Sequence, residues 1–105
     1  MFLNTAGANT MEIKTLQGIH KSKGGLIRSF VTVQNGKIKE ISISGDFFLF
    51  PEEASFRIVE EIKGIKAERE EVELKIKEIY ERENIQSPGT LPSDFTESIM
   101  KALEG

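Results

Sequence analysis

The front half of the chain alternates between apolar and polar residues with the two-residue period of a β-strand. Residues 11–15 (MEIKT) show this alternation, which predicts a first strand that ends near Gly18. A second run, residues 26–34 (LIRSFVTVQ), is rich in β-branched and aromatic residues and predicts a second strand. The polar and glycine-rich residues 20–25 (HKSKGG) between the two runs indicate a flexible link.

A tight hairpin is the clearest local signal. Asn35-Gly36 separates the second strand from residues 37–44 (KIKEISIS), and Asn-Gly between two such runs predicts a two-residue turn, because both turn positions need a positive φ. In the third strand Ile38 is out of phase with the two later isoleucines. A β-bulge near Lys39-Glu40 would bring all three to one face. Alternatively, Ile38 faces the other side.

The back half changes to the spacing of amphipathic helices. Pro51-Glu52-Glu53 predicts a first helix start, since proline and acidic side chains suit the first turn. A second helix is expected over residues 68–83, and a third after the breaker Ser87-Pro88-Gly89, with Ser93 or Asp94 as its cap. The apolar stripes are Phe56, Val59 and Ile62 (or Ile58 and Ile62) in the first helix, Val72, Ile76, Ile79 and Tyr80 in the second, and Phe95, Ile99 and Leu103 in the third.

Strands followed by helices predict an α+β fold, a small antiparallel sheet of about three strands packed with about three helices. With 105 residues, a single domain is expected. We assign it to residues 11–105 and expect the small, polar residues 1–10 to form a flexible leader. Met11 is then an alternative to Met1 as the translation start.

Composition narrows the class of protein. The chain has 38% apolar and 30% charged residues, which is typical of a globular domain rather than a disordered one. It has no cysteine, which excludes disulfides, thiolate metal sites and a cysteine nucleophile. No apolar run approaches the roughly 18 residues of a membrane span, and no signal peptide is evident. A cytoplasmic protein without a membrane partner is expected.

Charge is unevenly distributed. Residues 10–40 hold six basic against two acidic residues, a balance of +4, whereas residues 52–83 hold eleven acidic against seven basic residues, a balance of −4. Either these are two solvated faces, or the basic half meets an anion or an acidic surface. Glycine amides beside lysines can bind a phosphate, although an ordinary loop has the same composition. The possible anion contacts are Lys21, Lys23, Gly24, Gly25 and Arg28.

No autonomous active site is indicated. The single histidine, His20, falls in the predicted flexible link without a nearby metal partner and is expected to be solvated. Asp94 is expected to cap a helix, with Glu97 at the capping-box spacing. Phosphate-loop and dinucleotide-binding motifs are absent from the sequence. We therefore predict no catalytic residue and no metal site.

The run Gly45-Asp46-Phe47-Phe48, with Phe50 two residues later, suggests a tight turn. Asp46 is suited to accept hydrogen bonds from nearby backbone N–H groups, and the phenylalanines are either core or contact residues. Three aromatic side chains in four positions cannot all point one way along an extended chain. At least one is expected to face outward, toward another element or a partner.

Residues 20–103 resemble the C-terminal accessory domain of lipoate–protein ligases. The resemblance rests on Gly36-Lys37-Ile38, on Gly45-Asp46-Phe47-Phe48 and on Pro51-Glu52-Glu53. The closing segment also resembles the family, with Gly89, Asp94, Phe95 and Ile99 in matching places. One departure is Leu26, which stands where the family often has a lysine after its glycine pair; Lys21 or Lys23 are the candidates to replace it.

The resemblance implies a role without catalysis by this chain alone. It implies the separate small subunit of a two-chain ligase, because the family's catalytic domain is missing from these 105 residues. A heterodimer with the catalytic large subunit would activate lipoate with ATP to lipoyl-AMP, using Mg, and would transfer lipoate to an acceptor protein. This chain would bind no cofactor by itself. Gly45, Asp46, Phe47 and Phe48 then become the expected partner interface or adenylation support.

Two other functions compete with this one. A nucleic-acid-binding module could use the basic hairpin with Phe30, but the net charge of −3 and the lack of interleaved aromatic and basic residues argue against it. An adaptor could share the domain and serve an enzyme unrelated to lipoylation.

Overall fold

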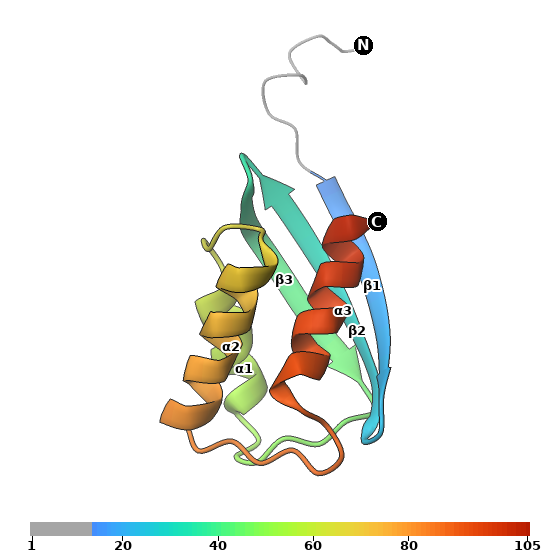
Figure 1. The fold of residues 1–105 in the computed structure, drawn as a ribbon, viewed down its shortest axis with the longest axis vertical. Helices are drawn as coiled ribbons and strands as arrows, with labels where there is room; N and C mark the ends of the chain where they lie inside the picture. Colours follow the sequence, from blue (N-terminus) through green and yellow to red (C-terminus); the bar gives the residue numbers. More distant parts are fainter. Residues whose placement is uncertain (1–13) are drawn as a thin grey trace, which may run out of the picture.

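An antiparallel sheet and a helical layer make up the fold (Figure 1). The computed structural model describes residues 14–105, and within this range there are three strands followed by three helices. The predicted leader and residues 11–13 of the expected first strand lie outside the described residues. The elements are β1 (Lys14–Ser22), β2 (Gly25–Gln34), β3 (Lys37–Gly45), α1 (Ala54–Ile62), α2 (Arg69–Arg82) and α3 (Pro92–Glu104). The α+β prediction is confirmed.

The sheet order is β1-β2-β3, and the helices pack on one of its faces (Figure 1). Helix α3 lies against β1 and β2, α1 lies against β3, and α2 packs on the other two helices. The core between the layers is formed by aliphatic residues and one phenylalanine. Its fully buried large members are Ile27, Val31, Ile38, Ile58, Ile62, Val72, Ile76, Ile79, Phe95 and Ile99. In the described part of the chain, no helix has the length and apolar character needed to cross a bilayer.

Two tight turns connect the strands. Asn35-Gly36 has φ values of 54° and 74°, so the predicted hairpin turn is confirmed. The β1–β2 connection is shorter than expected, because Ser22 already pairs with Gly25 and only Lys23-Gly24 lies between them. The predicted flexible link and the strand end near Gly18 are wrong, since β2 offers pairing partners that extend β1 to Ser22.

The predicted bulge in β3 is confirmed. Thr32 pairs with Glu40 whereas Val33 pairs with Ile38, so Lys39 is the extra residue. The inserted residue shifts the side-chain alternation by one position. The three isoleucines of β3 therefore all face the helices, two buried and the third packed at the margin of the core.

Helix α1 begins later than predicted. The backbone of Phe50 exchanges two 2.8 Å hydrogen bonds with Gln86, so the chain is still extended just before Pro51. A turn follows, in which the Ala54 N–H donates to the Pro51 carbonyl at 2.9 Å. The helix starts at Ala54, and the start predicted at Pro51 is wrong because the bridge to Gln86 holds this segment in place. Glu53 takes the N-cap position.

The helical stripes largely match the prediction. In α1, Ile58 and Ile62 are buried while Phe56 is 73% exposed, so the second of the two alternative stripes is correct. Helix α2 agrees with its predicted range to within one residue at each end. Leu91 is the N-cap of α3, so the prediction of Ser93 or Asp94 at that position is wrong. Pro92 at the first helical position fixes this earlier start.

Candidate partner interface

Three loops that are far apart in the sequence meet at one end of the molecule, shown at the bottom of Figure 1. We call this region, residues 22–26, 45–50 and 86–91, the loop junction. The Gly24 N–H donates to the Gly89 carbonyl at 2.8 Å, and the Asp46 N–H donates to the Leu26 carbonyl at 2.9 Å. Together with the Phe50–Gln86 bridge, these bonds connect all three loops.

Glycines occur in the loop junction because backbones approach each other closely there. A Cβ on Gly25 would clash with the Asp46 carbonyl oxygen, and a Cβ on Gly45 would clash with the Leu26 carbonyl oxygen. Both glycines also have positive φ, which other residues adopt at a cost. The glycine pair and the Gly-Asp turn therefore form one packed unit.

The phenylalanines of this segment divide into one that packs inward and two that point outward. The Phe47 ring meets the Phe95 ring edge to face, with centroids 5.1 Å apart and planes at 88°. Phe48 is 67% exposed and Phe50 is 51% exposed. The expectation that at least one of them faces outward is confirmed.

Asp46 does not act as the turn acceptor that its residue type suggested. Within residues 14–105 its carboxylate accepts no hydrogen bond, and only its backbone N–H is bonded, to Leu26. Asp46 is exposed, as is Phe48. It is therefore available to a partner, and its predicted interface role stays a prediction.

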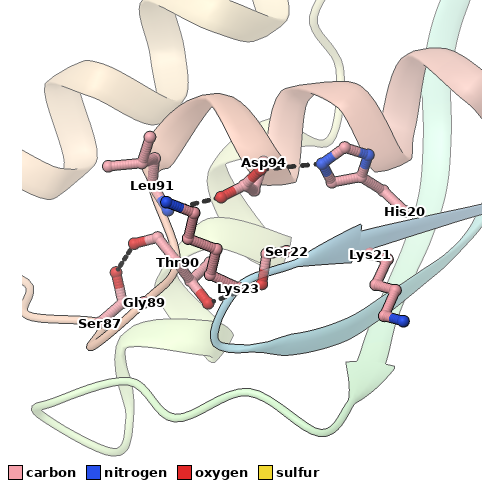
Figure 2. A pocket seen from close by; sticks show the side chains of 9 residues that line it. All are labelled: His20, Lys21, Ser22, Lys23, Ser87, Gly89, Thr90, Leu91 and Asp94. Atoms are coloured by element: carbon pink, nitrogen blue, oxygen red, sulfur yellow. Dashed lines mark hydrogen bonds and ion pairs between the residues drawn. The ribbon is translucent and has the colours of Figure 1, made fainter.

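A pocket of about 510 Å³ opens beside the junction, between the end of β1 and the start of α3 (Figure 2). Hydroxyl groups hold its base together: Ser22 Oγ lies 3.0 Å from Thr90 Oγ1, and Ser87 Oγ donates to the Thr90 carbonyl at 2.6 Å. The side chain of Lys23 extends across the pocket toward the start of α3 (Figure 2). The lining residues are His20, Lys21, Ser22, Lys23, Ser87, Gly89, Thr90, Leu91 and Asp94.

His20 lies in β1 and joins a polar cluster at this pocket. Its Nε2 is 2.8 Å from Asp94 Oδ1, and its Nδ1 is 3.0 Å from Lys101 Nζ. Since the lysine ammonium can only donate, Nδ1 accepts and Nε2–H donates to Asp94. The second Asp94 oxygen accepts the Leu91 N–H at 2.7 Å, which stabilises the start of α3.

The prediction of a solvated His20 is wrong, because the strand carries His20 to face α3. Asp94 does stabilise the helix start, as expected, but from the third helical position. The predicted pairing of Asp94 with Glu97 as a capping box is wrong, because Glu97 instead pairs with Arg69 at 2.5 Å. No local motif signals the contact between His20 and Asp94, which are 74 positions apart.

The five predicted anion contacts do not form one site. Lys23 lies at the pocket, and Lys21 lines its rim with its side chain directed away from Asp94 (Figure 2). The Gly24 N–H is already bonded to Gly89, so it is not free to bind a phosphate. Arg28 lies between the buried Ile27 and Ser29 of β2, so it faces the side of the sheet away from the helices.

The groups with shifted pKa values do not themselves line the pocket. A hydrogen bond from Arg82 lowers the pKa of Glu61, and one from Arg69 lowers the pKa of Glu97. Burial raises the pKa of Tyr80, whose hydroxyl lies 2.8 Å from Ser87 Oγ. Across residues 14–105, no three His, Asp or Glu side chains are placed to hold a metal ion together.

Comparison with known proteins agrees with the fold and the motifs. Residues 14–99 match the family model described as the bacterial lipoate protein ligase C-terminus. Lipoate-protein ligase A subunit 2 of Thermoplasma acidophilum is 35% identical over 79 residues, which cover 75% of this chain and 81% of that protein.

A solved structure is similar as well. It is that of an archaeal lipoylation system, a bi-partite lipoate protein ligase and its E2 lipoyl domain from Thermoplasma acidophilum. One of its chains matches with a TM-score of 0.77 and 32% identity, covering 84% of this chain and 97% of that chain. The resemblance predicted from the sequence is confirmed, and the chain belongs to the family of lipoate protein ligase C-terminal domains.

Proposed function

We propose that this chain is the accessory subunit of a two-chain lipoate–protein ligase, which acts with a separate catalytic subunit. The observation that carries this proposal is the match over 97% of the length of a chain from a bi-partite ligase. The reaction we assign to the complex is the ATP-dependent conversion of lipoate to lipoyl-AMP, followed by transfer to a lipoyl acceptor protein. We place it in the cytoplasm, in keeping with a sequence without cysteine.

The chemistry explains why an accessory subunit would help. Adenylation joins two anions, the lipoate carboxylate and the ATP triphosphate, which must be held in line away from water. A docked domain can order loops of the catalytic subunit without contributing a reacting group. The acidic side chains in residues 14–105 do not cluster into a metal site, so we assign the Mg of the reaction to ATP and the catalytic subunit.

The loop junction is the surface we assign to the catalytic subunit. Phe48 and Phe50 project from it, and exposed aromatic side chains are typical anchors of protein interfaces. Asp46 adds a carboxylate without an internal partner among the described residues. Phe47 serves from inside, because its contact with Phe95 holds the loop in position.

A lysine at the pocket places positive charge at the same end of the molecule as the loop junction. Within residues 14–105, Lys23 forms no ion pair, and it lies across the pocket at the start of α3. An ammonium group there could offset phosphate charge at the boundary between the subunits. The effect would appear in the adenylation step, in which lipoate reacts with ATP.

The test separates the two half-reactions. Lys23→Ala should slow formation of lipoyl-AMP from lipoate and ATP, while transfer from preformed lipoyl-AMP stays near the wild-type rate. Lys77→Ala is a matched control, since Lys77 is an exposed lysine on α2 that does not line the pocket. Equal loss in both half-reactions for Lys23→Ala would contradict the charge role.

A further inference from the structure

Strand β3 forms one edge of the sheet, and only its beginning is covered. There the Ile38 N–H donates to the Ile65 carbonyl at 2.9 Å, and the Gly64 N–H donates to the Ile38 carbonyl at 2.7 Å. In the described part of the chain, residues 41–45 have no pairing partner other than β2. These five residues leave a free edge about as long as a typical strand, roughly five to six residues.

The free edge presents backbone donors and acceptors in a defined pattern. Backbone groups of successive residues in an antiparallel strand point alternately toward the neighbour and away from it. Asp46 points toward β2, because its N–H donates to the Leu26 carbonyl. Gly45, the residue before Asp46, therefore points away from β2, and Ile43 and Ile41 do the same because the direction repeats every two residues. The N–H and C=O groups of these three residues point away from the sheet. An incoming strand would find them unpaired.

An apolar groove lies beside this edge. It is a pocket of about 320 Å³ between β3 and α1. Phe56 on α1 lines it and is 73% exposed, although the buried side of α1 is formed by other residues. The residues that line the groove are Ile41, Ser42, Ile43, Ser55, Phe56 and Val59. A free strand edge beside such a groove is the geometry in which proteins bind an extended peptide by strand addition.

The two ends of the edge carry opposite charges. At the hairpin end lie Lys37, Lys39 and Lys66, with Lys37 and Lys66 directly opposite each other in a bridge. At the other end lies Asp46, followed after the phenylalanines by Glu52 and Glu53. Of the ion pairs formed within residues 14–105, none involves these six side chains; the intervening Glu40 pairs with Lys63 at 3.5 Å. An extended partner would therefore be favoured by acidic residues at the hairpin end and basic residues at the Asp46 end.

We propose that the catalytic subunit adds one extended segment to the free edge of β3 at residues 41–45. The segment is apolar at the positions that enter the groove, acidic toward Lys37 and Lys39, and basic toward Asp46. This inference rests on the proposed function and names the contact by which the two chains hold each other. It is continuous with the loop junction, because β3 runs directly into Asp46 and Phe47.

Residue-resolved amide exchange, measured by NMR on this chain free and bound to the catalytic subunit, tests the inference. The amides of Ile41, Ile43 and Gly45 should slow by about tenfold or more on binding, because each gains a hydrogen-bond acceptor. The outer edge of β1 is the internal control, since the amides of Gln17 and Ile19 point away from β2 in the same way. Slowing at Gln17 and Ile19 without slowing at Ile41 and Ile43 would overturn the proposal.

Two matched substitutions provide a second readout. Phe56→Ser removes an exposed aromatic side chain from the groove. Leu74→Ser removes an aliphatic side chain that is 64% exposed on α2, outside the groove. Phe56→Ser should weaken the complex by about tenfold, whereas Leu74→Ser should leave its dissociation constant within about twofold of wild type. Equal effects of the two substitutions would overturn the proposal.

The outcomes distinguish this inference from the proposed function. A complex that forms and stimulates lipoyl-AMP synthesis without slowing exchange at Ile41 and Ile43 would refute strand addition alone. Protection of the same amides in a dimer of the isolated chain would identify a second copy as the occupant, and would also refute it. If no complex forms and lipoyl-AMP synthesis is unaffected, the proposed function and this inference both fail.

Discussion

Phe47 and Phe48 are neighbours in the sequence, yet the structure predicts opposite consequences of replacing them. Phe47 packs edge to face on the buried Phe95, whereas Phe48 is 67% exposed. Phe47→Ala should therefore destabilise the fold, and Phe48→Ala should leave the fold intact while weakening the complex with the catalytic subunit. The pair separates the internal support of the loop junction from its outer contact surface.

The magnitude follows from burial and from the ring contact. Truncating a fully buried phenylalanine to alanine costs about 3–5 kcal/mol, and about half of that applies to a half-buried ring. The lost edge-to-face contact, about 0.5–1.5 kcal/mol, is included in the same range. We expect Phe47→Ala to lower the free energy of unfolding by about 1.5–2.5 kcal/mol, which corresponds to a Tm lower by roughly 6–20 °C. For Phe48→Ala the expected change is within about 0.5 kcal/mol.

Urea unfolding followed by circular dichroism measures both stabilities, and titration with the catalytic subunit under native conditions measures both affinities. Phe48→Ala should weaken binding by about tenfold, or about 1.4 kcal/mol. The folded fraction of Phe47→Ala should lose less affinity for the catalytic subunit than Phe48→Ala does. The reasoning is refuted if Phe48→Ala destabilises the fold as much as Phe47→Ala does. It is also refuted if Phe48→Ala binds like wild type.

Three further predictions concern the fold and its pH dependence. Gly18→Ala should cost about 1–3 kcal/mol of stability, because a Cβ there would clash with the α3 backbone at Ser98; near-wild-type unfolding would contradict this close approach. Ser98→Ala should lower the free energy of unfolding by about 1–3 kcal/mol, since Ser98 Oγ lies 2.7 Å from the buried Ser29 Oγ. Adding Ser29→Ala should recover part of this stability, and losses that simply add in the double variant would count against the hydrogen-bonded pair. Burial raises the pKa of Tyr80, so its linkage contribution to stability is present below about pH 10 and is lost as pH rises through the folded pKa. Because the chain has one tyrosine and no tryptophan, tyrosinate absorbance reports this group alone, and a midpoint at or below about pH 10 in the folded chain would contradict the sign.

The parts of the fold that the sequence predicted are those set by neighbouring residues. Asn35-Gly36 fixes its turn by the φ angles it tolerates, and the phase of the β3 isoleucines suggested a bulge near Lys39-Glu40, which the structure places at Lys39. Helix α2 was predictable to within a residue because its stripe and its boundaries lie in one segment. In each case the determining interactions span only a few positions.

The features that the sequence did not predict depend on contacts between distant segments. His20 looked like a loop residue until pairing with β2 carried it to Asp94, and the start of α1 is set by the bridge between Phe50 and Gln86. For the same reason, the glycine pair suggested a phosphate loop, whereas Gly24 serves the close approach of the loop that contains Gly89. Residue type indicated that these positions are special, but only the tertiary contacts show what each residue does.

At the candidate interface, the sequence predicted that an aromatic side chain is exposed, but not which one. An alternating chain places neighbouring side chains on opposite faces, which implied that at least one phenylalanine is exposed. Which of the three packs inward depends on where Phe95 lies, on a helix that begins more than forty residues later. The groove beside β3 was not foreseen at all, because Phe56 fits a buried stripe as well as it fits an exposed position.

Pyrophosphate release by the catalytic subunit, supplied with lipoate, ATP and Mg, with and without this chain, tests directly whether this chain promotes lipoate activation. We predict that release is slow with the catalytic subunit alone, rises on addition of this chain, and saturates at one chain per catalytic subunit. Pyrophosphate release that is equally fast with and without this chain, while the two proteins are shown to form a complex, would contradict the role of an accessory subunit in lipoate activation.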